Sequence, residues 1–335
     1  MNRVNIYTQT PVTFVEDSAK YVDAILNLAK LTEEFGYTGI LVRYGEDKID
    51  PWVLSLKILE NTRSIIPLIA IQEDTLPPIT NTKMAYGASF LYDRSIYFNL
   101  ISGTEKQLKK DVSPEARYEG LAEYIEISKA LLKGTGNLVY KGKYHSYDSV
   151  QSFHVGHTKN IPKFYLSGTS HAGINAAKRV ADGFLSVAYP IKDFKKLLSG
   201  ADQTPNIEIG ICLGIVTRPT AREAWDAAKS FFPVTRETRI KALMKRGSKA
   251  GSIRYLAELA AEHEVIDQVY WLGGFCSDQT IYPYLVGNYE EVADYLNKYV
   301  ELGVSSLISC TKPATKEEFV HNKVMFDLLK KKVGV

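Results

Sequence analysis

The chain has 335 residues, of which 45% are hydrophobic and 24% charged, and its formal net charge is +3. This composition is typical of a globular protein with a large core, and it excludes the charge excess that indicates binding to nucleic acid or to an anionic membrane. The three cysteines, Cys212, Cys276 and Cys310, are far apart and lack metal-binding spacing, which favours thiols in a reducing compartment. Because the chain start lacks a signal-peptide pattern and no apolar run is long enough to cross a membrane, we expect a cytoplasmic protein.

Short apolar runs alternate with segments of helical periodicity along most of the chain. The expected strands cover residues 4–8, 39–42, 65–71, 96–101, 164–166, 183–187, 207–216 and 305–309. The expected helices cover residues 18–35, 51–59, 80–91, 114–132, 173–180, 222–231, 289–302 and 316–329. This α/β alternation, without a Pro- or Gly-rich linker, predicts one (β/α)8 TIM-barrel domain over residues 1–335. A doubly wound open sheet is the lesser alternative, because no dinucleotide glycine fingerprint follows the first strand.

Two segments do not fit the barrel repeat. Residues 134–152 have the pattern of an excursion of turns and short strands. Residues 235–287 are expected to form an insertion before the last strand; its first part is basic and then helical, with cations at Arg236, Arg239, Lys241, Lys245, Arg246, Lys249 and Arg254. These charges belong either to a solvated face or to a mobile lid or docking surface.

The run that begins at Phe164 breaks into small hydroxylated residues where a helix is expected to start. Ser167, Thr169 and Ser170 each offer a hydroxyl, and Gly168 allows backbone amides to approach a ligand. A helix N-terminus favours an anion, so this segment is a candidate phosphate site. The alternative is an ordinary N-cap between a strand and a helix.

The residues that follow the other strands are polar but offer little acid–base chemistry. They include no histidine pair and no metal-ligand cluster, so we expect no metal site. Glu73 and Asp74 are adjacent, so on an extended segment they point in opposite directions and do not form a pair of catalytic carboxylates. A site of this kind suggests a cofactor that supplies the difficult chemistry.

Several motifs, taken in order, resemble those of the bacterial luciferase-like flavin monooxygenases, in the alkanesulfonate monooxygenase branch. They are Phe35-Gly36-Tyr37-Thr38-Gly39-Ile40-Leu41, Asp50-Pro51-Trp52, Phe98-Asn99-Leu100-Ile101-Ser102, Arg117-Tyr118-Glu119, Tyr165-Leu166-Ser167-Gly168-Thr169-Ser170 and Ala181-Asp182. The resemblance implies a barrel that binds reduced FMN supplied by a separate NAD(P)H:flavin reductase, activates O2 and oxygenates a small substrate. It also implies a homodimer or a homotetramer.

The same resemblance assigns cofactor contacts to individual residues. Asn99 and Ser102 match positions at the flavin ring and ribityl chain, and Tyr118 matches a flavin-contacting tyrosine. Residues 167–170, which are Ser167, Gly168, Thr169 and Ser170, match the phosphate loop. Gln72 matches a position beside the flavin.

The chain departs from the sulfonate-cleaving branch at its cationic positions. Where those relatives carry an arginine and a histidine two residues apart, this chain has Cys212 and Gly214, and Leu272 replaces an arginine before a glycine pair. A sulfonate is a permanent anion that needs such cations, so we do not expect an alkanesulfonate substrate. Arg43 and Lys48 are new cations near the expected site.

Arg43 and Cys212 are therefore the substrate-side candidates for catalysis. Arg43 directly follows a strand, whereas Lys48 is also explained as a solvated loop charge. Cys212 is either reactive or a buried, inert thiol.

The sequence thus predicts an FMN-dependent, two-component monooxygenase that acts on a small or carrier-tethered substrate. Two alternatives remain at this point. One is a deazaflavin-dependent oxidoreductase on the same barrel, and the other is a flavin-binding or regulatory barrel that has lost its catalytic residues.

Overall fold

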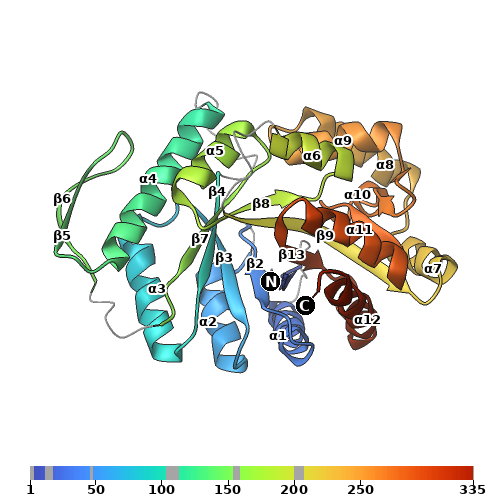
Figure 1. The fold of residues 1–335 in the computed structure, drawn as a ribbon, viewed down its shortest axis with the longest axis horizontal. Coiled ribbons are helices and arrows are strands. Elements are labelled where there is room, and N and C mark those ends of the chain that lie inside the picture. The colour runs from blue at the N-terminus through green and yellow to red at the C-terminus, as the bar shows by residue number, and fades with distance from the viewer. Residues whose placement is uncertain are drawn as a thin grey trace.

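Eight parallel strands close into a barrel. The computed structural model describes residues 4–11, 18–45, 48–102, 113–153, 159–199 and 207–334. The barrel strands are β1 (Asn5–Gln9), β2 (Gly39–Val42), β3 (Ile66–Gln72), β4 (Tyr97–Ile101), β7 (Lys163–Ser167), β8 (Gly183–Val187), β9 (Glu208–Arg218) and β13 (Val304–Cys310). Neighbours pair in the order β9-β13-β1-β2-β3-β4-β7-β8, and pairing between β8 and β9 closes the ring. The predicted (β/α)8 architecture is confirmed (Figure 1).

Helices cover the outside of this barrel (Figure 1). They are α1 (Ser18–Glu34), α2 (Pro51–Asn61), α3 (Pro78–Tyr92), α4 (Pro114–Leu132), α5 (His171–Val180), α6 (Ile191–Ser199), α7 (Ala221–Phe231), α11 (Tyr289–Glu301) and α12 (Lys316–Lys332). The sequence analysis did not identify the short, amphipathic α6. No helix in the described part of the chain is long and apolar enough to span a bilayer.

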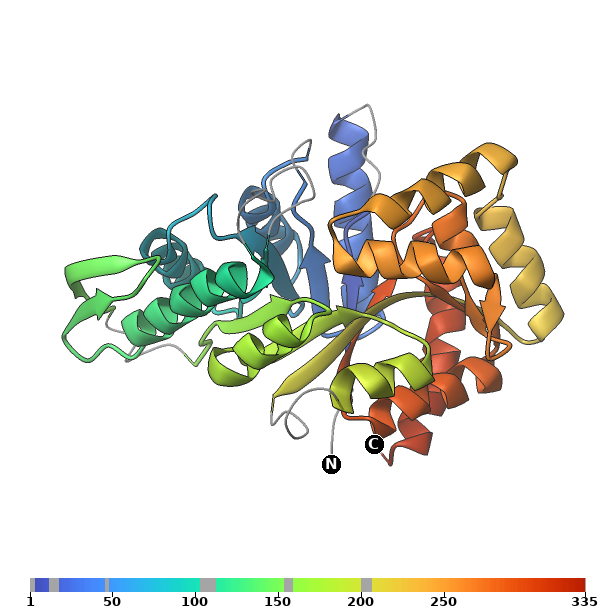
Figure 2. The same ribbon diagram turned by 90° about the horizontal axis from the view of Figure 1, so that it is seen from above.

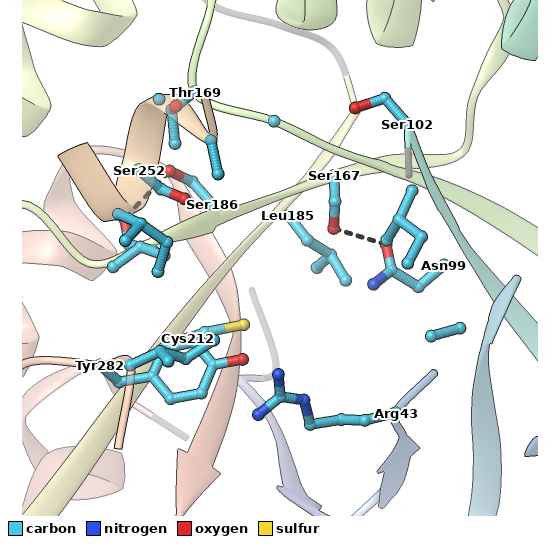
Figure 3. A pocket seen from close by; sticks show the side chains of 18 of the residues that line it. Arg43, Asn99, Ser102, Ser167, Thr169, Leu185, Ser186, Cys212, Ser252 and Tyr282 are labelled. Carbon is cyan, nitrogen blue, oxygen red and sulfur yellow. Dashed lines mark hydrogen bonds between the residues drawn. The ribbon is translucent and has the colours of Figure 1, made fainter. Parts of the chain in front are cut away.

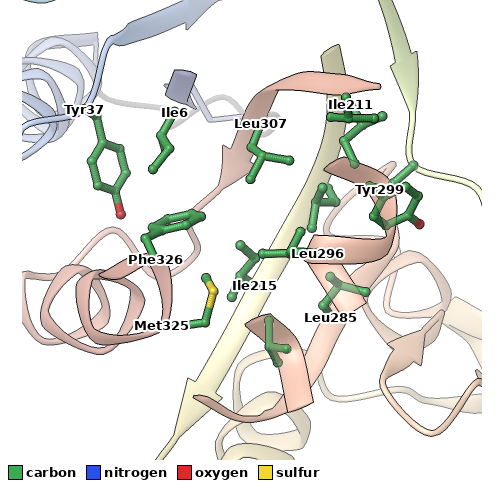
Figure 4. Packing of buried hydrophobic residues seen from close by; sticks show 14 of the residues in the cluster. Ile6, Tyr37, Ile211, Ile215, Leu285, Leu296, Tyr299, Leu307, Met325 and Phe326 are labelled. Atoms are coloured by element: carbon green, nitrogen blue, oxygen red, sulfur yellow. The ribbon is translucent and has the colours of Figure 1, made fainter. Parts of the chain in front are cut away.

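The main hydrophobic core lies between the outer face of the barrel and the helices. Figure 4 shows Ile211 and Leu307 of the strands facing Leu296 of α11 and Phe326 of α12, and all four side chains are buried. Because strand residues alternate between the two faces of a sheet, their neighbours point into the barrel. Residues of the strands, among them Tyr7, Leu68 and Ile308, form a second buried cluster, and several of its members also line the cavity described below.

The excursion after α4 is a hairpin of β5 (Asn137–Lys141) and β6 (Ser146–Gln151). In both views it projects beside α4, far from the α7–α10 side of the molecule (Figure 2). The carboxylate of Glu123 on α4 accepts hydrogen bonds of 2.7 to 2.9 Å from the backbone amides of residues 143–145. The buried carboxylate thus fixes the hairpin turn to the barrel.

The segment before the last strand contains more regular structure than the sequence suggested. Its elements are α8 (Arg236–Met244), the 3-10 turn η1 (Lys245–Gly247), α9 (Gly251–Glu262), β10 (Val265–Ile266), β11 (Tyr270–Trp271), α10 (Gly273–Cys276) and β12 (Tyr284–Asn288). The sequence analysis missed β12, which pairs in parallel with Gly214–Arg218 of β9. This pairing is available because β9 continues beyond the ends of β8 and β13.

Candidate functional site

A cavity of about 260 Å³ lies at the carboxyl ends of the barrel strands (Figure 3). Its lining consists of Leu41, Arg43, Tyr44, Ala70, Asn99, Ile101, Ser102, Tyr118, Ser167, Gly168, Thr169, Leu185, Ser186, Val187, Cys212, Ala250, Gly251, Ser252, Ile253, Ile281 and Tyr282. Hydroxyl groups are numerous in this lining. Arg43 is the only member of it, among the described residues, with an ordinarily ionised side chain.

Asn99 and Ser167 form a polar pair on two neighbouring strands. Asn99 lies on β4 and is buried, and Ser167 ends β7. The Ser167 hydroxyl donates a 2.6 Å hydrogen bond to Oδ1 of Asn99. That bond orients the amide so that its nitrogen faces the cavity, as Figure 3 shows. Ser102, directly after β4, adds a hydroxyl on the same side of the cavity (Figure 3).

Tyr118 reaches the same region from α4. Its buried hydroxyl donates a 3.3 Å hydrogen bond to the carbonyl of Ser167, and burial raises its pKa although Ser170 and Ser102 oppose the shift. A Cβ at Gly168 would lie 2.2 Å from the Tyr118 hydroxyl oxygen, and one at Gly173 would lie 2.7 Å from the ring. Gly168 is therefore needed to accommodate Tyr118, a reason that the sequence did not reveal.

Two helices begin next to Thr169. Ser170 is the N-cap of α5, where its hydroxyl accepts a 3.2 Å hydrogen bond from the amide of Gly173. The helix α9 begins at Gly251, and a Cβ there would lie 3.5 Å from the Thr169 hydroxyl. Ser252 also lines this end of the cavity (Figure 3). The start of α9 and the hydroxyls of Thr169 and Ser252 thus line one end of the cavity, and α5 begins two residues after Thr169, an arrangement that suits a phosphate.

The position of α9 is fixed by contacts with the barrel. The ring of Tyr255 stacks on Tyr189 at a centroid distance of 4.0 Å, and its hydroxyl donates a 2.7 Å hydrogen bond to Asp193 of α6. The helix α6, which the sequence did not predict, therefore holds α9, whose first residues border the cavity.

Arg43, Cys212 and Tyr282 meet at the opposite end of the cavity (Figure 3). The Arg43 amide donates a 3.1 Å hydrogen bond to the Thr10 hydroxyl, and the guanidinium lies 5.6 Å from the centre of the Tyr282 ring. Burial raises the pKa of the Cys212 thiol to about 12, although the Arg43 charge acts in the opposite direction. Cys212 is consequently a neutral thiol at physiological pH.

Eight of the ten site residues expected from the sequence line this cavity: Arg43, Asn99, Ser102, Tyr118, Ser167, Gly168, Thr169 and Cys212. Ser170 and Gln72 do not line it. Gln72 ends β3 with its side-chain nitrogen buried and unpaired. Within the described ranges, no group of three or more potential metal ligands occurs.

Sequence reasoning missed three polar lining residues, Ser186, Ser252 and Tyr282. Ser186 lies inside a strand, Ser252 lies in the basic insertion, and Tyr282 precedes the unrecognised β12. The apolar run that follows Pro283 is the sequence signal for the strand β12. Had this strand been predicted, Tyr282 would have been recognised as a residue just before it.

The positions that differ from the sulfonate-cleaving relatives are filled by packing. A Cβ at Gly214 would lie 2.1 Å from the ring of Tyr284, and Leu272 is completely buried. The Tyr284 ring thus occupies the space that a side chain at residue 214 would need. A histidine at residue 214 therefore does not fit while Tyr284 keeps its position.

The fold and the cavity define the class of protein. It is a (β/α)8 barrel with a ligand cavity at the carboxyl ends of its strands. The chain belongs to the luciferase-like monooxygenase family, whose model matches residues 3–306. It is accordingly a flavin-dependent monooxygenase of this family, and the resemblance drawn from the motifs is confirmed.

A curated relative and two solved structures illustrate the similarity. The chain is 30% identical over 327 residues to the 4-(gamma-L-glutamylamino)butanoyl-[BtrI acyl-carrier protein] monooxygenase BtrO of Niallia circulans, with 96% of each chain covered. The EDTA monooxygenase EmoA from Chelativorans sp. BNC1 shares 13% identity at a TM-score of 0.75, covering 99% of this chain and 94% of that one.

An F420-dependent secondary alcohol dehydrogenase shares 14% identity at a TM-score of 0.66, covering 98% of this chain and 99% of that one. At these identities both structures establish the fold alone.

Proposed function

We propose that this chain is the oxygenase of a two-component system that takes reduced FMN from an NAD(P)H:flavin reductase and uses O2 to oxygenate an acyl group tethered to a carrier protein. The single observation that carries the substrate class is the similarity, over nearly the full length, to a monooxygenase named for a carrier-bound acyl substrate. We also propose that the enzyme is a homodimer or a homotetramer, on the basis of the family resemblance.

The cavity supports FMN as the cofactor. A phosphate is an anion with several acceptor oxygens, and the Thr169 end offers the hydroxyls of Thr169 and Ser252 and the start of α9 as donors. Gln72 does not line the cavity, but its buried amide nitrogen at the end of β3 has no hydrogen-bond partner, so we keep Gln72 as a proposed neighbour of the flavin. When bound, reduced FMN supplies the two electrons and the activation of O2.

The residues of the chain then bind the cofactor, orient it and protect the reacting centre from water. We assign Ser167, Gly168, Thr169 and Ser170 to the phosphate segment, in which Thr169 contacts the anion and Ser170 holds the helix start. Asn99 and Ser102 offer polar groups to the ring and the ribityl chain, with Tyr118 supporting them.

The insertion of residues 235–287 is proposed to act as a lid over the phosphate end. Residues Ala250–Ile253 already form part of the cavity wall, so a bound ligand would hold the start of α9 in place. Water is thereby excluded from the reacting centre.

The proposal is tested by mass spectrometry of an acyl-carrier protein loaded with a γ-glutamylaminobutanoyl group. The purified chain is mixed with the loaded carrier, O2, FMN, NAD(P)H and a flavin reductase. We expect the carrier-bound acyl group to gain the mass of one oxygen atom, and the same acid without its carrier to remain unchanged. Replacing FMN with reduced F420 should abolish the reaction. Equal oxygenation of the free acid, or activity only with F420, contradicts the proposal.

A further inference from the structure

Arg43 carries a positive charge that the protein does not neutralise within the part of the chain that the structure describes. No described carboxylate forms an ion pair with it, and its Nη1 atom is buried without a hydrogen-bond partner. By contrast, the partly buried Arg218 is paired with the buried Glu318. Arg43 as a whole is partly buried, and a guanidinium nitrogen that is buried without a partner is costly, because it loses solvation without compensation.

The neighbours of Arg43 inside the barrel are neutral. Burial raises the pKa values of both the Cys212 thiol and the Tyr282 hydroxyl, so neither group supplies a negative charge at neutral pH. The backbone amide of Arg43 is held by Thr10, and its guanidinium lies over the Tyr282 ring. The cation is therefore held in place in a cavity whose described lining provides no anion.

The phosphate of the cofactor has its own site. Figure 3 shows Thr169 and Ser252 at one end of the cavity, with Arg43, Cys212 and Tyr282 at the other. A phosphate bound at the Thr169 end does not reach Arg43. A second negative group, on another ligand, can therefore bind at the Arg43 end.

We propose that Arg43 is the binding site for a carboxylate at the far end of the substrate acyl group. This inference rests on the proposed function and adds to it a substrate class, namely acyl thioesters that end in a carboxylate. The planar guanidinium matches a planar carboxylate through paired hydrogen bonds, and the low polarity around Cys212 and Tyr282 strengthens such a contact. Arg43 is thus a specificity residue rather than a source of protons.

The test measures binding by calorimetry in the presence of oxidised FMN, so that no turnover occurs. The probes are succinyl, glutaryl and adipoyl thioesters of pantetheine, each compared with the neutral primary amide of the same length. We expect at least one carboxylate probe to bind the wild type about tenfold more tightly than its amide. Arg43→Met should abolish this preference, and Arg43→Lys should retain part of it. Lys48→Met is the matched control, because Lys48 is a nearby cation that does not line the cavity.

A second readout is the melting temperature of the protein with and without a probe. Because Arg43→Met removes a partly buried charge whose Nη1 atom has no partner, the ligand-free variant should melt at a higher temperature than the wild type, and the carboxylate probe should no longer raise that temperature. Equal affinity for acid and amide at every length overturns the proposal. So does a loss of reduced-FMN affinity in Arg43→Met with the acid preference intact, because Arg43 would then serve the flavin. Failure of the wild type to bind reduced FMN instead contradicts the proposed function.

Discussion

At the scale of single residues, the tightest constraint in the site is the contact between Gly168 and Tyr118. Gly168→Ala would place a methyl group 2.2 Å from the Tyr118 hydroxyl oxygen, so the tyrosine or the loop must move. We expect this variant to lose about 1–3 kcal/mol of unfolding free energy, which urea denaturation measures. Adding Tyr118→Phe removes the clashing oxygen and should restore part of that loss.

Gly87→Ala provides the matched control. Gly87 lies in α3, and a Cβ there meets nothing within 4 Å. Alanine at this position should stabilise the protein by about 0.5–1 kcal/mol. Equal losses in the two variants would show that the contact with Tyr118 is not the cause.

The Cys212 thiol should be unreactive in the folded enzyme. Burial holds its pKa near 12, against an ordinary value of 9.0, so the nucleophilic thiolate is scarce at pH 8. Between pH 9.0 and about pH 12, the Cys212 thiol of the unfolded chain loses its proton while that of the folded chain keeps it. The contribution of Cys212 to the free energy of unfolding therefore falls as the pH rises through this range. Peptide mapping after iodoacetamide treatment should show slow alkylation of Cys212 at pH 8 and rapid alkylation in urea. Rapid alkylation of the folded protein would support a reactive thiol.

At the scale of elements, β9 connects the barrel to the insertion. Its first half pairs with β8 and β13, and its second half pairs with β12. The sequence predicted β9 from its apolar run, but β12 is a five-residue strand within a segment that has helical and basic signals. Gly214 and Tyr284 pack together there, and that contact involves residues distant in the sequence, which periodicity alone does not detect.

The start of α9 should become protected when the cofactor binds. Ala250–Ile253 line the cavity, and tryptic sites flank them at Lys249 and Arg254. We expect reduced FMN to slow cleavage between Arg236 and Arg254, because cleavage requires local opening. Cleavage at the exposed Lys323 of α12 serves as the internal reference. Unchanged cleavage across α8 and α9 would contradict the lid proposal.

At the scale of the whole molecule, the barrel was predictable because its strands and helices alternate along the chain. Inward-facing and outward-facing residues follow directly from that alternation, the ends of the strands indicated Arg43 and Ser167, and the family resemblance indicated Asn99. The cavity wall formed by α9 and by the segment before β12 was not predictable, since it depends on how an insertion folds back onto the barrel. Tyr255 stacking on Tyr189 is the long-range contact that fixes it.

We propose that the phosphate of FMN lies at Thr169 and Ser252, which both line the cavity, and this placement is the central claim. Its most direct test compares the affinities of reduced FMN and reduced riboflavin, which lacks the phosphate, under anaerobic conditions. We predict that the wild type prefers FMN, that Thr169→Ala combined with Ser252→Ala lowers FMN affinity about tenfold or more, and that riboflavin affinity is unchanged. A wild type with no preference for FMN, or a double variant that loses affinity for both flavins equally, would contradict the account.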